Sequence, residues 1–171
     1  MSQIQVQQEL GKAKNALQDF LIHKLLIPKV YLDAEWNGAL VDVLAIDRAG
    51  VGDVHAVWMI LDDQKGEEVI WRVLDFVRRF QSFSSHYRYV AVVCGPPSLR
   101  KAHEVVEESA IREALAEDGV GRVGILHVDL SEDNPPVKVI LKAERYRSSK
   151  EIVELADRFV AEHTPNWEVR D

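Results

Sequence analysis

The sequence predicts a single α/β domain in which helices flank a mixed β-sheet. The chain has 171 residues, of which 47 % are hydrophobic and 29 % are charged. Apolar residues recur at helical spacing in some segments and form continuous or alternating runs in others. Nine Gly, six Pro and no biased tract exclude the disordered and fibrous classes. We therefore expect one compact domain over residues 1–171.

The predicted elements follow the order α-β-β-β-α-β-α-β-β-α, without an internal repeat. Helical spacing predicts four helices, at Ile4–Ile27, Glu67–Phe80, Ser98–Glu117 and Ser149–His163. Apolar runs predict six strands, at Val30–Trp36, Ala39–Asp47, Val54–Leu61, Tyr87–Cys94, Arg122–Leu130 and Val137–Arg145. Short turns, the first at Asn37-Gly38, join the first three strands, so we expect an antiparallel meander. The longer helical crossover before the fourth strand permits a parallel pair.

Charge and cysteine content exclude several classes of protein. A net charge of −7 argues against non-specific coating of DNA, which depends on Lys and Arg neutralising phosphates. The single cysteine, Cys94, forms no internal disulfide and no cysteine-based zinc finger. No apolar stretch approaches the roughly 18 to 20 residues of a membrane span, and the first residues lack the features of a signal peptide. We expect a cytoplasmic protein without membrane association.

A first helix, a three-strand meander, a second helix and a buried strand form a familiar core order. Within it, Gly38–Asp47 is an apolar strand interrupted by Asp42, and Val54–Ile60 is the strand that follows. In these features the sequence resembles the PD-(D/E)xK nucleases, the restriction-endonuclease-like superfamily, over roughly residues 4–95. The resemblance implies a restriction-endonuclease-like core, completed by the remaining residues.

The resemblance also implies a type of active site. In such nucleases an Asp on the second strand and an acid-x-Lys on the third hold Mg²⁺ and orient the attacking water. Residues two apart on a strand face the same side, which lets an acid and a Lys share one site. Asp42 matches the Asp position, whereas Trp58 and Ile60 occupy the third-strand positions. Neither side chain ligates a metal, so the motif is degenerate.

The sequence offers other groups for a shifted site. Asp63-Gln64-Lys65 is an acid-x-Lys just beyond the third strand, although charged residues beside Gly66 are equally typical of a solvated turn. Glu9 and Glu35 are further candidate metal ligands beside Asp42, and ordinary surface residues in the other interpretation. Asp42 itself has the alternative of facing solvent or pairing with a cation.

Other chemistry has little support. The six histidines include no pair at the helical spacing of a zinc site, and no phosphate-binding glycine loop is present. Cys94, at the end of an apolar strand, is interpreted as a small buried residue rather than a nucleophile. One segment is basic and either contacts nucleic-acid phosphate or an acidic partner, or protects a sheet edge against aggregation. Its cations are Lys138, Lys142, Arg145, Arg147 and Lys150.

Two functions follow as hypotheses. In the first, a nuclease-like domain with an inactive site serves as a binding or assembly module, with a protein partner or a second copy of the chain. In the second, the chain is a divergent Mg²⁺-dependent DNA endonuclease that uses Asp42 with Asp63 and Lys65. Mg²⁺ is required only in the second. The first predicts that Trp58 and Ile60 share a buried apolar face, opposite to Val57, Met59 and Leu61.

Overall fold

The computed structural model describes residues 3–47, 53–62, 66–79, 83–94, 113, 122–145 and 150–168. Their helices are α1 (Gln3–His23), α2 (Gly66–Arg79) and α5 (Lys150–Glu162). Their strands are β1 (Lys29–Trp36), β2 (Ala39–Ile46), β3 (Val54–Asp62), β4 (Tyr87–Cys94), β5 (Gly124–Asp129), β6 (Val137–Leu141) and β7 (Trp167–Glu168). The predicted helix Ser98–Glu117 lies outside the described residues, apart from Glu113.

The strands form one mixed sheet in the order β6-β5-β4-β3-β2-β1-β7. The pairs β1–β2 and β2–β3 are antiparallel, as expected for the meander. The pairs β3–β4 and β4–β5 are parallel, and β6 and β7 pair antiparallel at the two ends of the sheet. The predicted α/β class with a mixed sheet is therefore confirmed.

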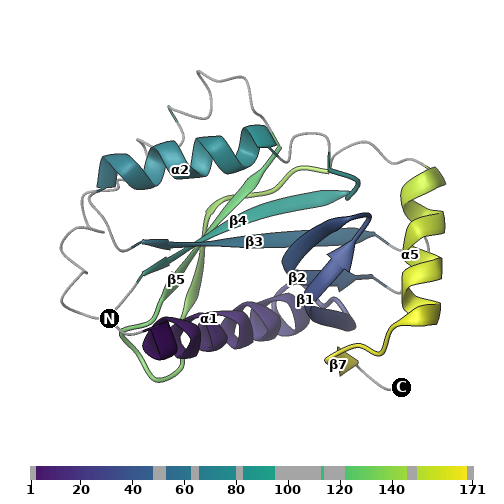
Figure 1. The fold of residues 1–171 in the computed structure, drawn as a ribbon, viewed down its shortest axis with the longest axis horizontal. Helices are drawn as coiled ribbons and strands as arrows, with labels where there is room; N and C mark the ends of the chain where they lie inside the picture. The colour runs from purple at the N-terminus through teal and green to yellow at the C-terminus, as the bar shows by residue number, and fades with distance from the viewer. Residues whose placement is uncertain are drawn as a thin grey trace.

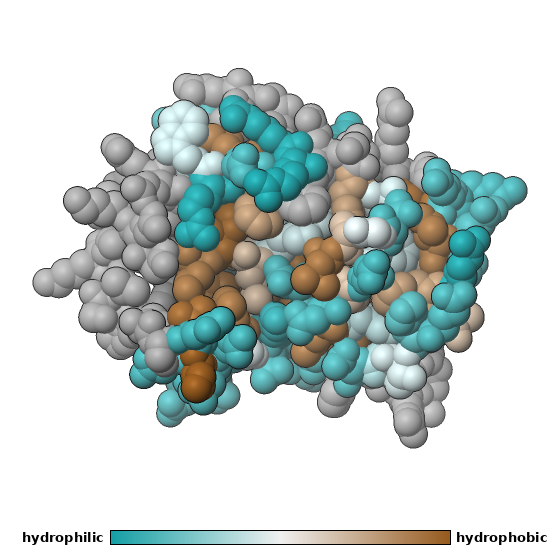
Figure 2. Space-filling model, in the orientation of Figure 1, coloured by the Kyte–Doolittle hydropathy of each residue, from teal (hydrophilic) through white to brown (hydrophobic). Residues whose placement is uncertain are grey.

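Helices cover both faces of the sheet (Figure 1). On one face, α1 packs on a core that includes Leu17, Leu21, Val43, Val57 and Leu126. On the other face, α2 covers the β3–β5 half and α5 covers the β1–β3 half. Figure 2 shows hydrophobic side chains between α1 and α2, with hydrophilic side chains around them. No helix in the described part of the chain is long and apolar enough to cross a membrane.

Local chemistry explains the best-predicted boundary. Asn37 and Gly38 both have positive φ values, 49° and 83°, as the two central residues of a tight hairpin require. This turn sets the β1–β2 register, in which Trp36 lies opposite Ala39.

Two predicted elements extend four residues beyond their ends in the structure, and one short strand was not predicted. Helix α1 ends at His23 rather than Ile27, because Leu26 adopts a left-handed conformation (φ 57°) and the Ile27 N–H bonds back to the Leu21 carbonyl. Strand β6 ends at Leu141 rather than Arg145, and Glu144 N–H instead bonds the Arg122 carbonyl. The two-residue strand β7 was not predicted, since two residues carry no periodic signal.

Candidate functional site

Asp42 lies where the alternation of strand β2 breaks. The β1–β2 ladder pairs Leu32 with Val43 and Ala34 with Val41 and skips the residues between them. One of these, Asp33, has a left-handed φ of 51°. Val41 belongs to the core beneath α5, as Leu44 does, although strict alternation would place residues three apart on opposite faces. Asp42 therefore lies at an irregular position of β2, where the alternation of the two faces is interrupted.

The Asp42 carboxylate accepts a hydrogen bond from the backbone of the neighbouring strand in the sheet. Its Oδ2 accepts a hydrogen bond of 2.7 Å from the backbone N–H of Met59 on the neighbouring strand. Burial raises the pKa of this carboxyl above its ordinary value, while the Met59 N–H and the positive charge of Lys14 oppose that shift. Lys14 on α1 forms its own ion pair with Asp33 at 2.6 Å. Asp42 therefore satisfies a backbone donor at the point where β2 and β3 diverge.

Between Val57 and Leu61 the third strand is apolar on both faces, as the sequence predicted. Trp58 and Ile60 are 4 % and 1 % exposed and lie in the cores beneath α5 and α2. Trp58 packs edge to face on Phe83, with ring centroids 4.8 Å apart, and donates a hydrogen bond to the Leu40 carbonyl. Met59 and Leu61 pack against the core beneath α1. The described part of β3 thus offers Asp42 no ionisable partner between Trp58 and Leu61.

The other predicted metal ligands are dispersed. Glu9 lies 3.9 Å from Lys12 on the same helix, and Glu35 is exposed on β1. Asp63 and Lys65 lie outside the described residues. Within the described ranges, no three His, Cys, Asp or Glu side chains gather in a way that would hold a metal ion.

The described cations of the basic segment lie in different surroundings. Arg145 forms an ion pair with Asp53 at 2.8 Å, and Lys142 lines a cavity. Lys138 is exposed on the end strand β6, and Lys150 is exposed at the start of α5. Arg147 lies outside the described residues.

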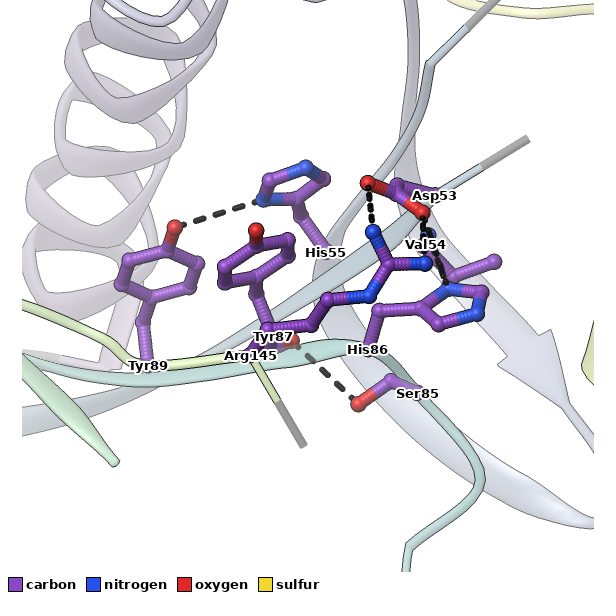
Figure 3. A network of polar contacts seen from close by, with 8 residues as sticks. All are labelled: Asp53, Val54, His55, Ser85, His86, Tyr87, Tyr89 and Arg145. Carbon is purple, nitrogen blue, oxygen red and sulfur yellow. Dashed lines mark hydrogen bonds and ion pairs between the residues drawn. The ribbon is translucent and has the colours of Figure 1, made fainter. Parts of the chain in front are cut away.

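A polar cluster that the sequence analysis did not identify lies where β3 and β4 begin (Figure 3). Two nitrogens of Arg145 contact the Asp53 carboxylate, at 2.8 and 3.1 Å. His86 is fully buried, and its Nδ1 accepts a 2.9 Å hydrogen bond from Val54 N–H. That acceptor role places the proton of the neutral ring on Nε2, which has no hydrogen-bond partner among the described residues. Burial lowers the pKa of His86, and the negative charge of Asp53 opposes this.

Beside this cluster, the rings of His55, Tyr87 and Tyr89 lie nearly parallel; we call these three residues the ring row. The His55 and Tyr87 rings stack with centroids 4.5 Å apart and planes 8° apart, and Tyr89 lies 6.1 Å from His55. His55 Nδ1 is 3.3 Å from the Tyr89 hydroxyl. Burial lowers the pKa of His55 to about 4, with Asp47 opposing and His86 and Arg145 reinforcing the shift. His55 is therefore neutral near pH 7.

The ring row forms one wall of a cavity of about 270 Å³, which we call the amino-end cavity. Its apolar lining comes from the end of α1 and from the strands β5 and β6, and its charged groups are Asp47, Asp53 and Lys142. The apolar lining residues are Phe20, Leu25, Leu126, Val139 and Ala143. The cavity lies on the α1 side of the sheet, away from the α5 side that holds Trp58.

The cavity was missed because its residues are distant in the sequence. Asp53 immediately precedes β3 and His55 lies on it, Tyr87 and Tyr89 lie on β4, and Arg145 lies beyond β6. One local signal was present, since His55 interrupts an apolar strand and Tyr87 and Tyr89 share one face of another. The parallel register that sets His55 opposite Tyr87 is a property of the sheet alone.

Comparisons with known proteins do not assign a family. No protein-family model matches the chain, and no curated protein matches it. Among solved structures, the chain is similar to a protein of unknown function from Silicibacter pomeroyi, with a TM-score of 0.45 and 12 % sequence identity. That similarity covers 78 % of this chain and 72 % of the other. Function is therefore inferred from the residues themselves.

Proposed function

We propose that the chain is a non-catalytic binding module built on a restriction-endonuclease-like core. The carrying observation is the 2.7 Å hydrogen bond from Met59 N–H to the Asp42 carboxylate. Mg²⁺ in a nuclease needs several carboxylate and phosphate oxygens at octahedral geometry, and it retains its water shell otherwise. Here the candidate Asp serves a backbone donor, and Trp58, Met59, Ile60 and Leu61 supply no second carboxylate from β3.

The order of the described elements supports the nuclease-like part of this proposal. Helix α1, the antiparallel β1–β3 meander, helix α2 and the parallel strand β4 follow the core order on which the resemblance was based. A fold of this kind does not fix an activity, so the loss of catalysis rests on the residues of β3.

The binding surface of such a module is not the basic segment as a whole. Arg145 is committed to Asp53, and Lys142 belongs to the amino-end cavity. Only Lys138 and Lys150 among its described cations are exposed outside these two arrangements. We therefore expect weak, strongly salt-dependent binding to DNA, and we expect a protein or small-molecule partner instead.

Two substitutions of Asp42 test the proposal. Asp42→Asn keeps an oxygen that accepts the Met59 N–H but removes the negative charge that a metal needs. Asp42→Ala removes both. We expect Asp42→Ala to lower the free energy of unfolding by about 1 to 2 kcal/mol, because the half-buried Met59 N–H loses its acceptor. Asp42→Asn is expected to lose clearly less.

The matching activity assay uses plasmid and single-stranded DNA with Mg²⁺ or Mn²⁺. We expect no metal-dependent cleavage by the natural protein above the level of Asp42→Asn. Cleavage that Asp42→Asn, Asp63→Ala and Lys65→Ala each abolish, with the stability of Asp42→Asn retained, would establish the divergent endonuclease instead. Cleavage that persists in all three variants would come from a contaminating nuclease.

A further inference from the structure

We propose that the amino-end cavity binds a small, uncharged, planar aromatic molecule that carries a hydrogen-bonding group. This site is separate from Asp42, so the proposal goes beyond the nuclease-like origin of the fold and does not depend on it. Its support comes from the size of the cavity, its unused polar groups, its charge balance and its apolar rim.

The cavity has the size of a one- or two-ring molecule. Its volume of about 270 Å³ lies just below the range of roughly 300 to 1,000 Å³ typical of ligand pockets. Its walls are largely apolar, from Phe20 and Leu25 on one side to Leu126 and Ala143 on the other. A few polar groups within a mostly apolar wall are the usual composition of a small-molecule site.

Two polar atoms of the ring row have no hydrogen-bond partner among the described residues. The hydroxyl of Tyr87 makes no hydrogen bond with any described residue, and neither does Nε2 of His55, whose Nδ1 faces the Tyr89 hydroxyl. Figure 3 shows the Tyr87 and Tyr89 hydroxyls directed to the same side, toward His55. A ligand that carries a hydrogen-bonding group can therefore pair with these two atoms in place of water.

Among the described residues, the charges at the cavity balance. Arg145 neutralises Asp53 through two contacts, and His55 is neutral near pH 7. Asp47 and Lys142, which also line the cavity, have opposite signs. A ligand with a net charge would lose its hydration without an excess of opposite charge to replace it, which favours an uncharged molecule.

The stacking geometry and the rim favour a planar ring. The His55 and Tyr87 rings are already stacked, 8° from parallel, so the wall presents flat π surfaces. At the rim, Leu25 and Val139 are 39 % and 44 % exposed. A flat apolar ligand that fills the cavity would cover part of both side chains and remove apolar surface from water.

The test uses four probes of similar size that differ in charge and shape. Benzamide is uncharged and planar, benzoate is an anion, benzamidinium is a cation, and cyclohexanecarboxamide is uncharged but not planar. Titrations of the full chain by protein-detected NMR report affinity and the residues that respond. We expect benzamide to bind at least about tenfold more tightly than the other three, with shifts at His55 and Tyr87, as charge burial and ring stacking require.

Variants separate this site from any other. Tyr87→Phe removes one hydroxyl and is expected to weaken benzamide about five- to tenfold, the effect of one lost hydrogen bond. Tyr31→Phe removes a hydroxyl in the core beneath α5 and should leave the affinity unchanged. Val139→Trp enlarges an exposed rim residue and should block binding while the protein stays folded.

Several outcomes overturn the proposal. Absence of benzamide binding is one, and tighter binding of benzoate or benzamidinium is another, because it shows a site selected by charge. Equal affinity for Tyr87→Phe and the natural protein places the probe elsewhere. None of these results bears on Asp42 or on DNA cleavage, so the function proposed above is tested separately.

Discussion

Two regions of the same sheet use their polar residues in different ways. Around Asp42, one half-buried carboxylate accepts a hydrogen bond from the backbone of β3. At the starts of β3 and β4, several ionisable and aromatic side chains gather beside a cavity, and some of their polar atoms have no partner in the described chain. The comparison teaches that the carboxylate matching the family pattern accepts a hydrogen bond from the backbone, whereas the larger cluster of ionisable and aromatic groups lies elsewhere in the sheet.

The largest expected effect is the loss of stability in Trp58→Ala, which tests whether packing of the third strand stabilises the region around Asp42. Trp58→Ala removes a nearly buried indole that contacts Phe83, and we expect the free energy of unfolding to fall by about 3 to 5 kcal/mol. Chemical denaturation measures the change. Trp71→Ala is the matched control, because Trp71 is 65 % exposed, and its effect should stay within about 0.5 kcal/mol. Equal effects of the two changes would show that Trp58 is a surface residue suited to an interface.

The next prediction concerns the wall of the amino-end cavity. A Cβ at Gly124 would lie 2.8 Å from Tyr89 Cδ1 and 2.9 Å from the backbone nitrogen of Ala143. Gly124→Ala should therefore destabilise the fold by about 2 to 3 kcal/mol through overpacking. Gly11→Ala is the control, since a Cβ there meets nothing within 4 Å and Ala favours the helix by about 0.5 to 1 kcal/mol. Thermal melts of both variants should shift in opposite directions, and a tolerated Gly124→Ala would mean that the ring row has room to move.

A third prediction is that the ring row and the Asp42 region contribute to stability with opposite dependence on pH. The folded-state pKa of His55, about 4, is below its ordinary value of 6.5, so the unfolded chain binds more protons between these values. The contribution of His55 to the free energy of unfolding is therefore fully present above pH 6.5. It falls on acidification, by about 2 kcal/mol between pH 8 and 5. His86, whose pKa is also lowered, acts in the same direction. The raised pKa of Asp42 acts in the opposite direction as pH falls.

The measurement is a series of denaturation curves on the natural protein and on His55→Gln. The variant keeps a polar group near Tyr89, Asp47 and Arg145 but does not titrate in this range. We expect the acid-induced loss to shrink by about 2 kcal/mol in His55→Gln. An unchanged pH profile would show that His55 is not held neutral by burial.

The smallest effect is expected for the ion pair at the edge of the cluster. The Arg145 and Asp53 side chains are 39 % and 19 % exposed, so water screens their attraction. Arg145→Gln should cost about 0.5 to 1 kcal/mol, with the loss reduced at high salt. A loss above about 3 kcal/mol that salt does not affect would indicate a buried, uncompensated Asp53 instead.

Much of the fold was predictable because local patterns encode it. The Asn37-Gly38 turn, the apolar runs of β1 to β4 and the helical spacing of α2 and α5 each act over a few residues. The face shared by Trp58 and Ile60 followed from strand alternation alone. The end of β6 did not, since the Glu144 bond to Arg122 depends on a neighbouring segment.

The candidate sites were predicted unevenly for the same reason. Asp42 was identified because it interrupts an apolar strand, but its partner, Met59 N–H, depends on how β2 diverges from β3. His55 and Tyr87 are 32 residues apart and meet only because β3 and β4 pair in parallel.

The sequence by itself determined the element types, the meander and the apolar character of β3, because propensity and periodicity act between near neighbours. Tertiary structure alone decided that Arg145 meets Asp53, that His86 accepts a hydrogen bond from Val54 N–H and that a cavity forms between α1 and the ring row. Such contacts join segments whose spacing along the chain carries no information about their distance, and strand order and register supply that distance.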